Sequence, residues 1–224
     1  MKNIKIAIDG PAAAGKSTVA QLVAKQLNFV YIDTGAMYRA VTVYCLWNDI
    51  DCRDEQKVAS VLDNINITLY PDHSISLNDR DVTKEIRSTI VNENVSYIAA
   101  NKEVRYFLVK QQRKIAENVS VVMDGRDIGT YVLPNADVKI FQIASVDTRA
   151  KRRYLENIQK GIPCSLESIT KELEKRDYID SHRELAPLKK ADDAISLDTS
   201  NMTIEEVVNA IMDIIYRKVG NVHA

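Results

Sequence analysis

Short apolar runs alternate with segments of helical periodicity along most of the chain. Residues 4–9 and 29–33 are apolar or β-branched runs. The segment between them has apolar side chains at helical spacing, namely Val19, Leu22, Val23 and Leu27. Further runs of the same kind recur at residues 120–124, 138–145 and 194–198. Five buried strands that alternate with helices predict an α/β fold on a five-stranded parallel sheet.

One segment departs from this alternation. Between residues 63 and 84, Ile65, Ile67 and Leu69 alternate with polar residues, and the alternation resumes after the turn-forming residues 70–74. This pattern predicts a small β-hairpin insert.

The last helix is predicted from its cap and its apolar face. Thr203 and Glu206 have the spacing of a capping box. The face expected to be buried consists of Ile204, Val207, Val208, Ile211 and Ile215.

The residues after the first apolar run match a phosphate-binding loop. They satisfy G-x-x-x-x-G-K-[ST], with a predicted strand before and a predicted helix after. In such a loop, N–H groups and the helix N-terminus face phosphate oxygens. Lys16 would contact the terminal phosphates, and the Ser17 hydroxyl would bind Mg²⁺. The nucleotide is expected to contact Gly10, Pro11, Ala12, Ala13, Ala14, Gly15, Lys16, Ser17 and Thr18.

Two motifs of guanine-nucleotide switches are missing. No glycine has an Asp three residues before it, so there is no D-x-x-G, and Asn101-Lys-Glu is followed by Val104 rather than by the Asp of N-K-x-D. ATP is therefore the expected nucleotide, and a small-molecule kinase is favoured over a switch protein that binds a partner.

Phosphoryl transfer needs positive charge around both phosphates, since the protein contributes mainly position and field. Arg39 and Arg126 each follow a predicted strand, where ligands of open α/β sheets bind. Arg176, Asp180 and Arg183 are spaced i, i+4 and i+7, so we expect them on one helix face with the carboxylate between two guanidiniums. The alternative is a solvated helix with ordinary salt bridges.

A mobile helical lid is expected over residues 149–183. Gly161 and Pro163 would provide its hinge, and Arg149 and Arg153 are four residues apart and share a helix face.

The charge balance limits the expected partners. Thirty Lys and Arg residues oppose 31 Asp and Glu residues, which gives a formal net charge of −1. No overall field draws the chain to nucleic acid or to anionic lipid, and we expect neither partner.

The first apolar run is too short for a signal peptide or a membrane span, which predicts a cytoplasmic protein. No unexplained apolar stripe is evident, which favours a monomer.

Together these residues resemble the bacterial cytidylate kinases, within the nucleoside monophosphate kinases. The resemblance covers nearly the whole chain. It rests on IDGPAAAGKST, DTGAMYRA, VSYIA, MDGRDIGT, VKIF and ADDAISLDTS, in that order, with Arg105, Arg153, Arg176, Asp180 and Arg183 at matching positions.

The resemblance implies a three-layer P-loop NTPase fold and one kinase domain over residues 1–220. Its core would comprise about residues 1–62, 85–148 and 184–220, with a monophosphate-binding insert at about 63–84 and the lid at about 149–183.

The resemblance also implies a cytosine pocket. Positions matching Asp127, Ser96 and Arg105 place a carboxylate or hydroxyl opposite the 4-amino group and a cation opposite the acceptors of the base. Uracil would leave Asp127 facing an acceptor, so CMP and dCMP should be preferred over UMP. The alternative for Asp127 is an ion pair with Arg126 or Arg105.

Phosphate-binding positions follow from the same resemblance. Arg39 and Arg126 match arginines that bind phosphate, and Arg176 and Arg153 match arginines around the transferred group. Asp124 ends a strand in the manner of a Walker-B carboxylate; it either holds a magnesium-bound water or caps the following turn.

Three further positions lie on the acceptor side. Asp180 matches a carboxylate that contacts the sugar hydroxyl, and Arg183 matches a position close to the acceptor nucleotide. Thr34 stands where many relatives carry Ser and keeps the hydroxyl.

The predicted activity is ATP-dependent phosphorylation of CMP and dCMP to CDP and dCDP in pyrimidine nucleotide metabolism, with Mg²⁺ as cofactor. Its catalytic residues would be Lys16, Arg126, Arg153 and Arg176. Two alternatives remain: a kinase of the same architecture that acts on UMP, AMP or an alcohol such as shikimate, and a nucleotide-dependent switch.

Overall fold

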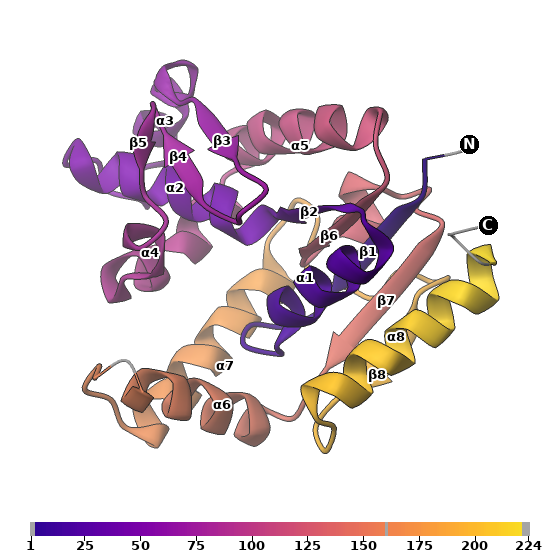
Figure 1. Cartoon of the computed structure of the whole chain (residues 1–224). Helices are drawn as coiled ribbons and strands as arrows, with labels where there is room; N and C mark the ends of the chain where they lie inside the picture. Colours follow the sequence, from indigo (N-terminus) through magenta and orange to yellow (C-terminus); the bar gives the residue numbers. More distant parts are fainter. Residues whose placement is uncertain (1–2, 160, 221–224) are drawn as a thin grey trace. The chain divides into compact units, whose positions relative to one another are not determined.

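All five predicted strands form in the computed structural model, which describes residues 3–159 and 161–220. They make one five-stranded parallel sheet of order β2-β6-β1-β7-β8 (Figure 1). The strands are β1 (Lys5–Asp9), β2 (Val30–Asp33), β6 (Val121–Gly125), β7 (Val138–Ile143) and β8 (Ile195–Asp198). Central β1 pairs with both β6 and β7, so that Asp9 lies opposite Gly125 on one side and Phe141 on the other.

The chain divides into two compact units. The first comprises Met1–Tyr31 and Val119–Ala224, and the second comprises Ile32–Asn118. Residues 1, 2 and 160 of the predicted domain lie outside the described residues.

The first unit buries its core where two helices cover the sheet. Its helices are α1 (Lys16–Leu27), the π-helical turn η3 (Ile128–Val132), α6 (Val146–Gln159), α7 (Leu166–His182) and α8 (Ile204–Val219). Helices α1 and α8 contact each other on one face of the sheet (Figure 1), where Val23 and Ile211 pack with Ile6 and Ile8 of β1.

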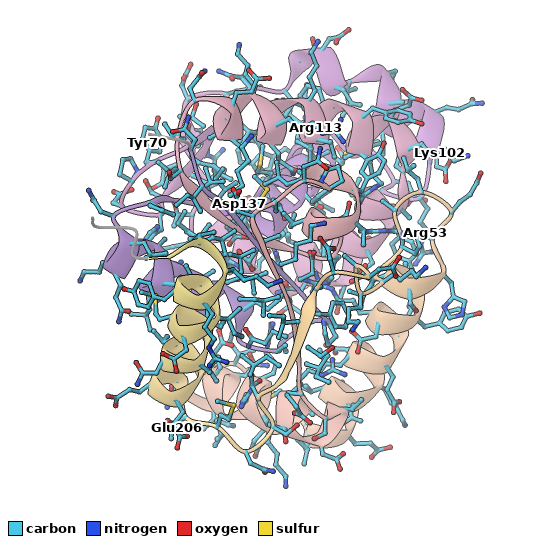
Figure 2. All side chains as sticks on the ribbon, turned by 90° about the vertical axis from the view of Figure 1, so that its right-hand side faces the viewer. Arg53, Tyr70, Lys102, Arg113, Asp137 and Glu206 are labelled. Carbon is cyan, nitrogen blue, oxygen red and sulfur yellow. The ribbon has the colours of Figure 1, made fainter. Side chains whose placement is uncertain are left out.

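Helix α8 begins with the predicted capping box. The Thr203 hydroxyl accepts from the Glu206 N–H at 3.2 Å, and the Glu206 carboxylate accepts from the Thr203 N–H at 2.8 Å; Figure 2 labels Glu206 at this end of the helix. The prediction that Ile204 is buried is wrong, because its side chain is 55% exposed. Ile204 is the first residue of the helix, and periodicity does not define where along a helix the packed face begins.

Helices α6 and α7 pack against each other (Figure 1). Their apolar contact includes Ala150, Ile169 and Leu173, and it extends to Ala12 in the loop after β1. The segment predicted as a lid is therefore a helical pair with a small core of its own.

The second unit has a separate core. Its helical elements are α2 (Thr34–Trp47), α3 (Glu55–Ser60), η1 (Leu62–Asn64), η2 (Glu85–Arg87), α4 (Thr89–Ala100) and α5 (Lys102–Glu117). Its antiparallel sheet has three strands, β3 (Ile67–Leu69), β4 (Ile75–Leu77) and β5 (Arg80–Asp81), where the sequence predicted a two-stranded hairpin. The third strand is two residues long, so it leaves no periodicity to detect.

No helix among the described residues has the length and apolar character needed to cross a membrane.

Candidate active site

The loop between β1 and α1 has backbone conformations that explain its glycines. Gly10 has a φ of 152°, and a Cβ at this position would overlap the backbone carbonyl oxygen of Gln142 on β7. Gly15 caps α1 in the left-handed region with a φ of 86°. Ala13, between them, is also left-handed with a φ of 56°, which costs an L-residue about 1–2 kcal/mol.

Side chains hold three carbonyl groups of this loop. The Lys16 Nζ donates to the Pro11 carbonyl at 2.7 Å, the Arg149 Nη1 donates to the Ala12 carbonyl at 3.0 Å, and the Gln142 Nε2 donates to the Ala14 carbonyl at 2.6 Å. In a trans peptide the N–H points opposite to the C=O. The N–H groups of Ala13 and Gly15 consequently point away from the donors Arg149 and Gln142, as an anion-binding loop requires.

Lys16 is buried at the start of α1. Burial lowers the pKa of Lys16 well below its usual value, and the Arg126 guanidinium lowers it further, while Asp124 and Asp9 oppose the shift. An anion that enters the site would stabilise the charged form of Lys16, which burial disfavours.

Ser17 and Asp124 lie together at the same end of the sheet. The Ser17 hydroxyl donates to the Asp124 carboxylate at 2.9 Å, and the Tyr31 hydroxyl donates to the other oxygen of Asp124 at 2.8 Å. The contact with Ser17 shows that Asp124 faces the end of the phosphate loop, and the contact with Tyr31 of β2 fixes the carboxylate there. Among the described residues, no group of three or more His, Cys, Asp and Glu side chains is arranged to hold a metal ion.

Predicted catalytic arginines gather beside the phosphate loop. The half-buried Arg176 has a pKa lowered to about 10, first by loss of solvation and then by the charges of Arg126 and Arg153. Arg176 also lowers the pKa of Lys16. Arg126 and Arg176 thus repel Lys16 as well as each other, and an incoming phosphate would relieve this repulsion.

Asp180 on α7 balances part of this charge. Its carboxylate accepts from the Arg126 Nε at 2.9 Å. Burial raises the pKa of Asp180, but Arg126, Arg176 and Arg183 together lower it below the usual value. The carboxylate is therefore ionised at neutral pH and fixes the Arg126 side chain.

The prediction of one helix face for Arg176, Asp180 and Arg183 is wrong for Arg183. Helix α7 ends at His182, and Arg183 is its C-cap, with an extended backbone. The Arg183 Nη2 donates to the Asp127 carboxylate at 3.1 Å, and its Nε donates to the Ala186 carbonyl at 2.8 Å. Asp127 is thus ion-paired, as the alternative proposed, and Arg183 is a partner that the alternative did not name.

The remaining predicted residues lie in the second unit. Thr34 is the first residue of α2, and Arg39 on the same helix donates from its Nε to the Asn92 side chain at 3.4 Å. Ser96 is buried on α4. Arg105 on α5 is completely buried; it donates to the Ala99 carbonyl at 3.2 Å, and its guanidinium lies 5.5 Å from the centroid of the Tyr38 ring.

Residues 6–217 match the family described as Cytidylate kinase. The chain belongs to the cytidylate kinase family. It is 55% identical over 221 residues to the cytidylate kinase of Geobacillus sp. (strain WCH70), covering 97% of this chain and 99% of the relative. It is 52% identical over 223 residues to that of Leuconostoc mesenteroides, covering 98% and 100%. These matches confirm the resemblance inferred from the motifs.

Two solved structures that resemble this chain are remote from it in sequence. A gluconokinase from Sinorhizobium meliloti 1021 has a TM-score of 0.52 at 12% identity, covering 99% of this chain and 96% of that one. An uncharacterized protein from Eubacterium ventriosum ATCC 27560 has a TM-score of 0.51 at 15% identity, covering 96% and 99%. This likeness concerns the fold alone, and it agrees with the predicted α/β class.

Asp9 was not predicted as a site residue, yet it organises the site. Its two oxygens accept from the N–H groups of Ile128 and Gly129 at 2.8 and 2.7 Å, which fixes the turn that follows Arg126 and Asp127. Burial raises the pKa of Asp9 to about 7. An Asp directly before the first glycine of the loop motif was the signal available in the sequence.

Asp33 and Arg87 form a second arrangement that the sequence analysis missed. Asp33 caps α2 through the Ala36 N–H at 2.8 Å and accepts from the Arg87 Nη2 at 2.7 Å. Burial opposes ionisation of Asp33, but Arg87 and Arg39 lower its pKa below the usual value. The N-cap was detectable from Asp33 before the helix, whereas the pairing with Arg87 spans 54 residues.

Proposed function

We propose that this member of the cytidylate kinase family transfers the γ-phosphoryl group of ATP to CMP and dCMP, giving ADP and CDP or dCDP. One observation carries the proposal: Lys16 of a phosphate loop lies in the electrostatic field of Arg126 and Arg176, in a chain that matches this family over nearly its whole length. Arg153 in turn acts on Arg176.

The donor side consists of the loop from Gly10 to Thr18. Its N–H groups and the N-terminus of α1 would bind the phosphates of ATP, and Lys16 would contact the terminal ones. Magnesium prefers oxygen ligands, and the Ser17 hydroxyl and the Asp124 carboxylate, 2.9 Å apart, fit such an ion. Ser17 would bind it directly and Asp124 through water. When bound, Mg²⁺ supplies charge neutralisation at the phosphates.

The transfer itself needs no covalent enzyme intermediate. An oxygen of the acceptor phosphate attacks the γ-phosphorus in line, and the bond from that phosphorus to the bridging oxygen of ADP breaks. Arg126, Arg153 and Arg176 would stabilise the charge that spreads over the transferred oxygens. Asp180 holds Arg126 in a fixed direction, and preorganised donors of this kind avoid reorganisation during the reaction.

Recognition of the acceptor base is assigned to Asp127, Ser96 and Arg105. A carboxylate accepts more than one hydrogen bond, so the pairing of Asp127 with Arg183 is compatible with a further bond from the 4-amino group of cytosine. Arg183 would then hold the Asp127 carboxylate in a fixed orientation. Uracil presents an acceptor at the same position, which leaves Asp127 unsatisfied.

The remaining acceptor contacts are assigned to other side chains. Arg39, together with Arg126, would bind the acceptor phosphate, Asp180 would contact the sugar hydroxyl, and Thr34 would contribute its hydroxyl.

We further propose that the protein acts as a monomer in the cytoplasm, that residues 149–183 close over the bound nucleotides, and that neither nucleic acid nor membrane is a partner.

The test is a selectivity panel. ADP production from MgATP is measured with CMP, dCMP, UMP, AMP, GMP and shikimate offered separately, and Lys16→Ala serves as the control. We expect strong turnover with CMP and dCMP that disappears in the variant. Turnover of another acceptor without CMP would refute the pocket assignment, and no turnover of any acceptor would favour a partner-dependent switch.

A further inference from the structure

Ala12 of the phosphate loop is held at both of its backbone polar groups. Its N–H donates to the Asp177 Oδ1 at 3.2 Å, and its carbonyl accepts from the Arg149 Nη1 at 3.0 Å. The same Nη1 of Arg149 lies 2.7 Å from the Asp177 Oδ2. These three contacts close a ring around one residue, which we call the Ala12 clamp.

The clamp joins the loop to two different helices. Arg149 comes from α6 and Asp177 from α7, while the Ala12 methyl group packs with Ala150, Ile169 and Leu173 of the same helices. Arg149 is buried, and its Nε also donates to the Ala144 carbonyl at 2.9 Å. The bond to Ala144 therefore orients the Arg149 guanidinium independently of its contact with Ala12.

The conformation of the next residue indicates what the clamp does. Ala13 is left-handed, although nothing in its side chain favours that region. A strained backbone conformation of this kind persists only where several contacts with the surrounding structure hold it in place. The clamp fixes the chain before Ala13, and the bond from Gln142 to the Ala14 carbonyl fixes it afterwards. The N–H of Ala13 is thereby directed away from Arg149, on the side where the phosphates of ATP would lie.

We infer that Asp177 and Arg149 are positioning residues for the donor nucleotide: the Ala12 clamp sets the phosphate loop in its binding conformation and couples ATP binding to the packing of α6 and α7. This inference rests on the proposed function only in naming ATP as the ligand. Asp177 also lies in the field of Arg126 and Arg176. A test must therefore separate the hydrogen bond to Ala12 from the effect of its charge on those arginines.

Two substitutions at Asp177 make this separation. Asp177→Ala removes both the charge and the acceptor for the Ala12 N–H. Asp177→Asn removes the charge but keeps a carbonyl acceptor of the same shape. Glu174→Ala is the matched control, since it removes an exposed carboxylate from the same helix.

The readouts are the Kd of the protein for ATP without acceptor, and the KM values for ATP and CMP. We expect Asp177→Ala to weaken ATP binding about tenfold, Asp177→Asn to weaken it about threefold, and Glu174→Ala to stay within about twofold, because an acceptor for the Ala12 N–H persists in Asn. The KM for CMP should change less than about twofold in all three.

Three results would overturn the inference. Equal effects of Asp177→Ala and Asp177→Asn would assign the role to charge alone. Unchanged ATP affinity in Asp177→Ala would remove the clamp from the donor site. Equal loss of affinity for ATP and CMP, with a lower melting temperature, would mean a purely structural pair. Absence of CMP turnover in the unaltered protein would instead refute the proposed function, because the ATP affinities need no acceptor.

Discussion

Gly10→Ala tests the steric explanation of the phosphate loop. Gly10 lies where the chain leaves β1, and an added Cβ would overlap the backbone carbonyl oxygen of Gln142. Gln142 has little freedom to retreat. It pairs with Leu197 of β8, and its side chain donates to the Ala14 carbonyl. The substitution must therefore displace the loop, β7 or both.

The cost of this substitution has two parts. Overpacking a well-filled site costs about 1–3 kcal/mol. Placing an L-residue at the φ of Gly10, 152°, a region that L-residues rarely adopt, adds about 1–3 kcal/mol. The sum is about 2–6 kcal/mol of unfolding free energy, which corresponds to a fall of on the order of 10 °C in the melting temperature for a chain of this size.

Gly161→Ala is the matched control for Gly10→Ala. Gly161 also has a positive φ, 68°, but nothing lies within 4 Å of the position that its Cβ would take. This variant carries only the conformational cost of about 1–2 kcal/mol. Thermal denaturation of both variants, together with their KM for ATP, gives the comparison. The steric explanation would be refuted if Gly10→Ala lost no more stability than Gly161→Ala and kept its affinity for ATP.

Three further outcomes follow from the site. Burial raises the pKa of Asp9 from 3.8 to about 7, so the native state binds this proton more tightly than the unfolded chain, and stability should fall as the pH rises from about 4 to about 7. Melting temperatures of Asp9→Asn should lack this pH dependence, and a dependence parallel to that of the unaltered protein would contradict the explanation. Arg126→Lys keeps the positive charge but loses the planar guanidinium that Asp180 orients, so kcat should fall more than about tenfold with the fold intact. Unchanged kinetics would show that Arg126 does not act in the site. Asp127→Ala should narrow the ratio of kcat/KM for CMP to that for UMP, and an undiminished ratio would mean that another group distinguishes the bases.

Local pattern was sufficient for the features that depend on neighbouring residues. The five strands, the phosphate loop and the capping box of α8 each have a signature within a few residues, and all of them form. The loop motif also located Lys16 and Ser17 correctly at the start of α1. Family resemblance extended the predicted site to arginines that no short motif would connect.

Features that depend on tertiary contacts were beyond the sequence. The i, i+4, i+7 spacing suggested a common face for Arg183, but the helix ends one residue earlier and the side chain turns to Asp127, 56 residues away. Asp9 and Asp177 act on backbone N–H groups that lie more than 100 residues away. Spacing does not encode such contacts, because a carboxylate that binds distant backbone looks like any other carboxylate.

The most direct test of phosphoryl transfer is a phosphorus NMR time course of the unaltered protein with MgATP and CMP. The proposed function predicts that the γ-phosphate signal of ATP declines while the signals of ADP and CDP appear in equal amounts, without inorganic phosphate. Release of inorganic phosphate without CDP, or an unchanged spectrum, would contradict it.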